Sequence, residues 1–178
     1  MSVIEAYRNT GDAGQHAAFL TLFTAAAAGI SIAESLIPVP FWKPGLGNIV
    51  VLLLLVFDRK KDAVIVGISR TFVAAFFKGG IFGPGHILSV GGAVASLIIM
   101  MLLAAWKKNS ISGISAAGAF FHSAAQLGIA SLFLVSLDAI VFVAPLFLGI
   151  SIVSGLLTGW VACVILQRNG YVYEKSTG

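Results

Sequence analysis

Long apolar stretches separated by short polar segments run through most of the chain. They cover residues 16–37, 46–57, 63–77, 86–106, 114–137 and 139–167. A membrane-spanning helix needs about 20 apolar residues, and the first, fourth, fifth and sixth stretches reach that length. The second and third are shorter and flank DRKKD at 58–62. Because burying these charges in hydrocarbon would be very costly, we expect two short crossings rather than a re-entrant loop. The pattern predicts an all-α, polytopic bundle of six transmembrane helices, two of them short.

The composition agrees with a membrane protein and excludes several other classes. Hydrophobic residues make up 58% of the chain and charged residues 10%, against about 45–50% and 25% in soluble domains. The single cysteine, Cys163, allows neither an intrachain disulfide nor a cysteine metal cluster. The net charge of +4 is spread over short loops and forms no basic face with interleaved aromatic residues. We therefore expect membrane lipid around the chain and no nucleic-acid partner.

The charges of the loops predict the orientation in the membrane. Residues 1–15 form a polar tail without the apolar core of a signal peptide, residues 16–168 form the membrane domain, and residues 169–178 form a second tail. With six crossings, one side carries Arg8, Arg59, Lys60, Lys61, Lys107, Lys108, Arg168 and Lys175, and the other only Lys43 and Lys78. Positive charge favours the inner side. We expect a multi-pass protein of the cell (cytoplasmic) membrane with both termini cytoplasmic.

Two loops on the predicted outer side are rich in proline and glycine. They are SLIPVPFWKPGLGNIV at 35–50 and KGGIFGPGH at 78–86. Each adjoins a helix that is too short to reach the membrane surface, and irregular backbone at that depth is tolerated where it lines a cavity. The loops therefore favour the roof and wall of an outward-facing pocket. Two tight turns are the alternative, because proline and glycine are the usual turn residues.

Polar residues within the apolar stretches are the candidates for a binding site, because ionisable groups in membrane helices are costly. The helices contain Glu34, Arg70, His122 and Asp138, the outer rim contains Lys43, Lys78 and His86, and the amides are Asn48 and Gln126. All lie in the predicted outer half or near mid-depth, which favours a site open to the outside. Arginine suits carboxylate or phosphate, and the cations outnumber the acids. A partly anionic ligand follows, unless Arg70 instead forms an internal ion pair with Glu34.

Catalytic and metal-binding signatures are missing from the sequence. There is no Ser/His/Asp order, Walker loop, paired-carboxylate motif or zinc motif. His86 and His122 lie at different predicted depths, a poor arrangement for a metal or haem. We expect no enzymatic activity, no metal and no cofactor, and without a P-loop the chain cannot hydrolyse ATP alone.

Small residues recur every four positions on two of the predicted helices. The first carries Ala25, Gly29 and Ala33, and the sixth carries Ser151, Gly155, Gly159 and Cys163. Such ridges let membrane helices approach closely. They explain either packing within the bundle or the docking of a partner subunit.

Four segments together resemble the Gx transporter family, which is often labelled heptaprenyl diphosphate synthase component I. They are ESLIPVPFWKPGLGN (34–48), ISRTFVAAFFKGGIFG (68–83), SVGGAVASLIIMMLL (89–103) and ISAAGAFFHSAAQLGIAS (114–131), and the resemblance covers residues 17–168. Members of this family look like the S components of energy-coupling-factor (ECF) transporters. Those are six-helix bundles that work with a membrane coupling subunit and two cytoplasmic ATPases. The resemblance implies these partners, with Ala25, Gly29 and Ala33 facing the coupling subunit.

The leading interpretation is the S component of an ECF-type transporter that takes up a small anionic vitamin or cofactor precursor. Its expected substrate-binding residues are Glu34, Lys43, Asn48, Arg70, Lys78, His86, His122 and Gln126. One alternative is a membrane accessory of prenyl diphosphate or quinone synthesis. It would be non-catalytic, because the chain lacks the Asp-rich motif that holds Mg²⁺ in prenyl diphosphate synthases. A second alternative is a stand-alone secondary carrier, with Glu34 or Asp138 carrying a coupling proton.

Overall fold

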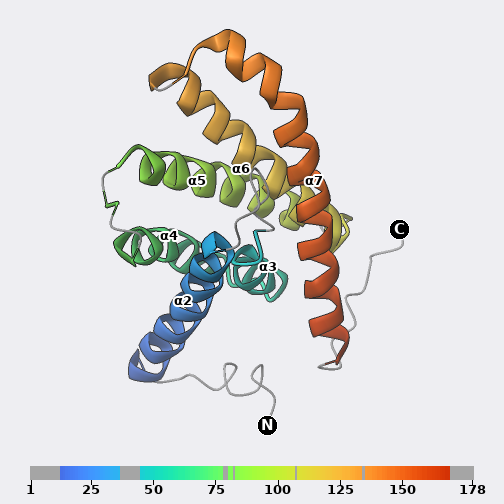
Figure 1. The fold of residues 1–178 in the computed structure, drawn as a ribbon. Helices are drawn as coiled ribbons and strands as arrows, with labels where there is room; N and C mark the ends of the chain where they lie inside the picture. Colours follow the sequence, from blue (N-terminus) through green and yellow to red (C-terminus); the bar gives the residue numbers. More distant parts are fainter. Residues whose placement is uncertain are drawn as a thin grey trace.

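The described part of the chain is entirely helical (Figure 1). The computed structural model describes residues 13–36, 45–77, 80–81, 83–106, 108–133 and 135–168. Within them lie α2 (Ala13–Leu36), α3 (Asn48–Val56), α4 (Lys60–Phe77), α5 (Pro84–Ala105), α6 (Ile111–Phe133) and α7 (Leu137–Arg168). The predicted all-α fold is confirmed, and each predicted stretch corresponds to one helix.

The charged segment 58–62 was expected to be a loop, and this is wrong for its second half. Lys60, Lys61 and Asp62 form the first turn of α4. An acidic side chain is favourable there, because the first turn exposes unpaired N–H groups. Asp62 is also buried, and its Oδ1 lies 3.1 Å from Nε2 of His16 on α2. This contact ties the first turns of α2 and α4 together.

The turn between α3 and α4 explains how so short a connection reverses the chain. Asp58 has a φ of +57°. The N–H of Arg59 donates to the carbonyl of Leu54 at 2.9 Å, and the N–H of Asp58 donates to that of Leu55 at 3.0 Å. This pair of hydrogen bonds is a Schellman motif with aspartate in the position that glycine usually takes. The turn therefore satisfies carbonyls at the end of α3 while it starts α4.

Helix α3 lies at the centre of the molecule and contacts each of the other five described helices. Its side chains are buried all round: Val51, Leu52 and Leu54 are at most 2% exposed. A helix that is apolar on every side belongs in a core. The sequence predicted a short crossing here, and the structure shows the central packing element of the bundle.

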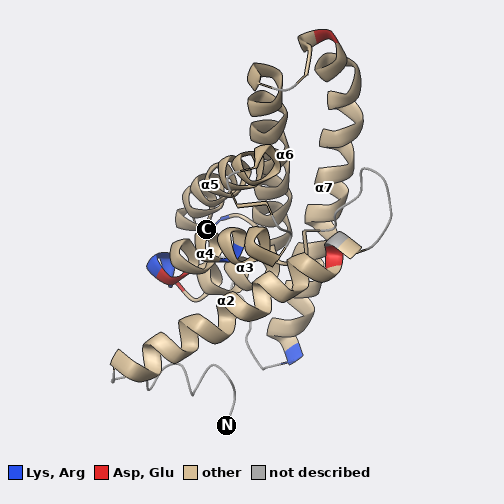
Figure 2. Cartoon of the chain, turned by 60° about the vertical axis from the view of Figure 1, so that its left-hand side comes forward, with Lys and Arg blue, Asp and Glu red and all other residues tan. Residues whose placement is uncertain are grey.

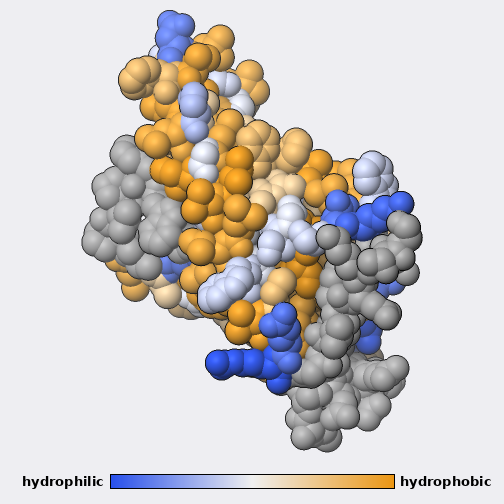
Figure 3. Space-filling view, turned by 90° about the vertical axis from the view of Figure 1, so that its right-hand side faces the viewer, coloured by the Kyte–Doolittle hydropathy of each residue, from blue (hydrophilic) through white to orange (hydrophobic). Residues whose placement is uncertain are grey.

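Within the described residues, four helices are long and apolar enough to span a membrane. The spans are Ala13–Glu34, Pro84–Ala105, Ile111–Phe133 and Leu137–Arg168. Nine residues make α3 only about 14 Å long, against about 30 Å for the hydrocarbon layer. Charged residues are sparse along the helices (Figure 2), and most of the coloured surface over α7 is hydrophobic (Figure 3). Large apolar side chains such as Phe142 and Trp160 are exposed. These features are those of a membrane protein.

The two ridges of small residues have different surroundings. On α7, a Cβ added to Gly155 would lie 2.6 Å from Cα of Ala116, and one on Gly159 would lie 2.5 Å from Cα of Ser112. This ridge therefore packs within the bundle, against α6. On α2, Ala25, Gly29 and Ala33 are exposed, and a Cβ added to Gly29 would meet nothing within 4 Å. Their contact with a partner stays a prediction.

Candidate functional site

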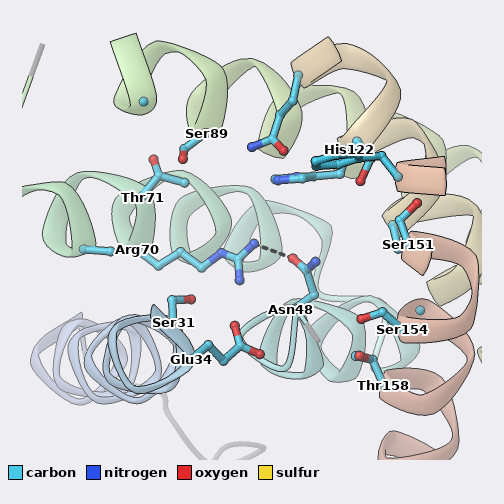
Figure 4. Close-up of a pocket in the computed structure, with 18 of the residues that line it drawn as sticks. Ser31, Glu34, Asn48, Arg70, Thr71, Ser89, His122, Ser151, Ser154 and Thr158 are labelled. Atoms are coloured by element: carbon cyan, nitrogen blue, oxygen red, sulfur yellow. Dashed lines mark hydrogen bonds between the residues drawn. The ribbon is translucent and has the colours of Figure 1, made fainter. Parts of the chain in front are cut away.

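A cavity of about 590 Å³ lies among the helices, and all six described helices contribute to its lining (Figure 4). It is found where α2 ends, where α3 and α5 begin, and beside the middle of α7. Ligand pockets measure about 300–1,000 Å³, so the volume suits one small organic molecule. Six of the predicted binding residues line it: Glu34, Asn48, Arg70, His86, His122 and Gln126.

The other two predicted binding residues, Lys43 and Lys78, lie outside the described residues. Asp138 is exposed in the first turn of α7 and does not line the cavity. Sequence reasoning had placed it in the same outer layer as the other ionisable groups. Because a helix of 32 residues extends beyond its neighbours, a polar residue in its first turn does not share the depth of the cavity.

One end of the cavity carries two opposite charges on neighbouring helices. Arg70 reaches from α4 and donates from Nη2 to Oδ1 of Asn48, the first residue of α3. Glu34, near the end of α2, accepts the N–H of Leu46 at its Oε1. Both charged side chains are buried, at 7% exposure for Arg70 and 8% for Glu34. The start of α3 is thus held from both sides.

Glycines make this close approach possible. Gly45 has a φ of +67°, and the N–H of Asn48 donates to its carbonyl at 2.9 Å as α3 begins. A Cβ on Gly47 would lie 2.3 Å from Oγ of Ser31 and 2.8 Å from Nη1 of Arg70. Only a residue without a side chain leaves room here for the guanidinium group.

The structure answers the question whether Arg70 and Glu34 neutralise each other in an ion pair. Among the described residues, the salt bridges join His16 to Asp62 and Lys60 to Asp58. No salt bridge joins Arg70 to Glu34 in the described part of the chain, although the charge of Glu34 acts on Arg70 electrostatically. The hydrogen bond of Arg70 goes to a neutral amide instead, so its positive charge is not cancelled at short range.

Two buried nitrogen atoms of the lining have no hydrogen-bond partner within the described part of the protein. They are Nε of Arg70 and Nδ1 of His86, whose residue is 8% exposed and packs its ring against Phe72 at 4.9 Å. Leaving one buried polar group unsatisfied costs about 1–3 kcal/mol. Both atoms belong to residues that line the cavity, so a polar ligand or water held there is the natural partner.

The opposite wall of the cavity is polar but uncharged. Ser89 comes from α5, His122 from α6, and Ser154 and Thr158 from α7 (Figure 4). Gln126 of α6 also lines the cavity. The imidazole of His122 packs closely on α5, since a Cβ on Gly92 would lie 2.9 Å from its ring. This wall offers hydroxyl, amide and imidazole groups that donate and accept hydrogen bonds.

Sequence reasoning missed the hydroxyl groups. The lining also contains Ser31, Thr71, Ser89, Ser115, Ser123, Ser151, Ser154 and Thr158. A signal was present on α7, where Ser151, Ser154 and Thr158 follow at spacings of three and four and so share a face. They lie on the same side of α7 as Gly155, whose closeness to α6 brings them to the cavity.

The donor set of the cavity does not suit a tightly bound metal. Among the described residues, no group of three or more His, Cys, Asp or Glu side chains could hold an ion. Imidazole, amide and hydroxyl groups around one arginine and one carboxylate suit an organic solute that makes several hydrogen bonds.

Fold and site together define a helical membrane protein with a polar cavity among its helices. The family described as heptaprenyl diphosphate synthase component I matches residues 23–165, and the chain belongs to this family. The predicted family is therefore confirmed. Comparisons with curated proteins and with solved structures gave no match.

Proposed function

We propose that this protein is the substrate-binding membrane subunit, the S component, of an ECF-type transporter. Its cargo would be a small anionic vitamin or cofactor precursor. The observation that carries the proposal is the cavity, because six of the predicted binding residues, from five different helices, line it together. A catalytic residue is not required for this role, and the chain acts without enzymatic activity of its own.

Each part of the cavity has a task in this proposal. Arg70 provides the positive charge, and Asn48 holds its guanidinium group in place. His122 and Gln126 supply hydrogen bonds from the facing wall. With both termini cytoplasmic, the cavity end formed by Glu34 and the start of α5 faces outward. Cargo thus enters from the outside.

The energy for release would come from partners, because the sequence contains no P-loop. A coupling subunit would dock on the exposed face of Ala25, Gly29 and Ala33, and cytoplasmic ATPases would drive it. Small side chains allow another helix to approach closely in a membrane. The open space around Gly29 supports this choice of surface.

The family description favours a second candidate, a membrane accessory of prenyl diphosphate synthesis. In that role the chain would bind a synthase or its product without catalysing the reaction. The aspartates after residue 20, Asp58, Asp62 and Asp138, are never adjacent and cannot hold Mg²⁺ as an Asp-rich motif does.

Native mass spectrometry of the full chain, purified gently from its own host, separates the two candidates. Recovery with a membrane coupling subunit and ATPases supports the S component. Recovery with a soluble prenyltransferase supports the accessory and refutes transport. Uptake of cargo by the chain alone in vesicles with a proton gradient would contradict both, because it would make the protein a self-sufficient carrier.

A further inference from the structure

We propose that the cavity selects a ligand with a single carboxylate, held at the Nε side of Arg70, and an uncharged polar body. The inference rests on the proposed function in one respect, namely that the ligand is the transported cargo. It narrows the substrate class from anionic solutes in general to monocarboxylates.

The surroundings of Arg70 determine where an anion fits. Nη2 donates to Asn48, and Nη1 lies against Gly47, where a Cβ would approach it to 2.8 Å. Nε has no partner among the described residues and belongs to a side chain that is 7% exposed. The Nε side of a guanidinium presents two parallel N–H donors, which match the two oxygens of a carboxylate. Asn48 thus holds one corner of the group, Gly47 leaves room for the second, and the buried Nε is the donor that still needs a partner.

Glu34 explains why the anion carries one charge rather than several. It lines the same cavity and is buried. In the described part of the lining, Glu34 and Arg70 are the residues with formal charge, and they have opposite signs. A diphosphate would need several cations or a magnesium ion, and it would meet the carboxylate of Glu34 at close range. A monocarboxylate satisfies Arg70 with the least repulsion.

The other walls fit an uncharged polar body. His86 offers an unpartnered Nδ1, which donates or accepts according to its tautomer. Across the cavity, Gln126 and the hydroxyls of Ser154 and Thr158 face the same space. Among the described residues of this wall, hydroxyl, amide and imidazole groups are available to a ligand, and none carries a formal charge.

A fragment experiment tests the charge and shape of the ligand group that binds at Arg70, and it does not require the cargo to be known. The full chain in lipid nanodiscs is heated in acetate, in acetamide and in pyrophosphate, at equal ionic strength made up with chloride. Acetate and acetamide differ by the charge alone. We expect acetate, at ten times its Kd, to raise the Tm by about 2–5 °C, and acetamide and pyrophosphate to raise it by less than 1 °C.

Three variants assign the effect to Arg70. Arg70→Gln removes the charge, and Arg70→Lys keeps the charge but loses the paired donors; both should abolish the acetate shift. Arg168→Gln, at the exposed end of α7, should retain it. If Arg70→Gln does not fold, Arg70→Lys decides alone.

Each outcome has a defined meaning. Equal shifts with acetate and acetamide, a larger shift with pyrophosphate, no acetate shift in the unaltered chain, or an unchanged acetate shift in Arg70→Lys would each overturn the inference. A neutral cargo found by native mass spectrometry with ECF partners would overturn it and leave the proposed transport function intact. An acetate shift that depends on Arg70, in a chain that co-purifies with a prenyltransferase, would support the monocarboxylate site and overturn the proposed transport function.

Discussion

Replacing Gly155 by alanine tests the close packing of α7 on α6, which shapes one wall of the cavity. The new Cβ would lie 2.6 Å from Cα of Ala116 and 2.8 Å from Cβ of Ala119. Both are rigid atoms, so the helices themselves must separate. Overpacking of this kind costs about 1–3 kcal/mol, and the better helix propensity of alanine returns about 1 kcal/mol.

The backbone contacts place the cost in the upper part of that range, which leaves a net loss of about 1–2 kcal/mol. For a chain of this size the Tm should fall by about 2–8 °C. Circular dichroism during heating of the detergent-purified protein measures it. Gly149→Ala on the same helix is the matched control, because its Cβ meets nothing within 4 Å. A Gly155→Ala protein that melts at or above the control would refute the close α6–α7 contact.

Three further predictions concern the Arg70 site, the exposed face of α2, and the contact between the first turns of α2 and α4. Gly47→Ala should weaken cargo binding at least tenfold, because the new Cβ displaces the guanidinium of Arg70. Isothermal titration measures this once the cargo is identified, and unchanged affinity would contradict the role of Gly47 in positioning Arg70. Gly29→Leu should abolish recovery of the coupling subunit in pull-downs while the Tm changes by less than about 2 °C; retained partners would exclude this face. His16→Ala should lower the Tm by about 2–6 °C through loss of its contact with Asp62, and an unaltered melting curve would show that the contact adds no stability.

The helices and much of the site were predictable because membrane sequences carry a strong signal. Apolar stretches of sufficient length become helices, so the predicted and observed elements agree to within a few residues. Glu34, Arg70 and His122 are recognisable in the sequence because an ionisable group in an apolar membrane helix is costly and usually functional. Their meeting at one cavity followed from their shared depth, which the lengths of the helices determine.

The partner of Arg70 could not be predicted in the same way. The sequence left open whether Arg70 binds a ligand or pairs with Glu34, and the structure shows a hydrogen bond from Arg70 to Asn48. The choice depends on how α3 and α4 cross and on the space left by Gly47. The pattern of apolar positions predicts neither the crossing of α3 and α4 nor the space at Gly47.

The hydroxyl groups were missed for a different reason. Serine and threonine can satisfy their hydroxyls on their own helix, as Ser31 does on the carbonyl of Ala27 at 3.0 Å and Ser151 on that of Leu148 at 2.8 Å. A single hydroxyl in an apolar stretch therefore costs little and marks no site, and only a shared face, as with Ser151, Ser154 and Thr158, gives a signal. Only the packing of α7 on α6 shows which of them reach the cavity.

The polar wall shared by α6 and α7 has a consequence for biosynthesis. Helix α6 is the least hydrophobic of the four long apolar helices, and α7 is the most hydrophobic. His122 and Gln126 already pack against Gly92 of α5. Before α7 is made, however, Ser115, which later lies against Gly159, has no counterpart in the chain and would lie against lipid. The two helices should therefore leave the translocon as a hairpin, with α7 drawing its less hydrophobic neighbour into the bilayer. The polar surface that α6 presents to α7 thus makes its insertion depend on the helix that follows it.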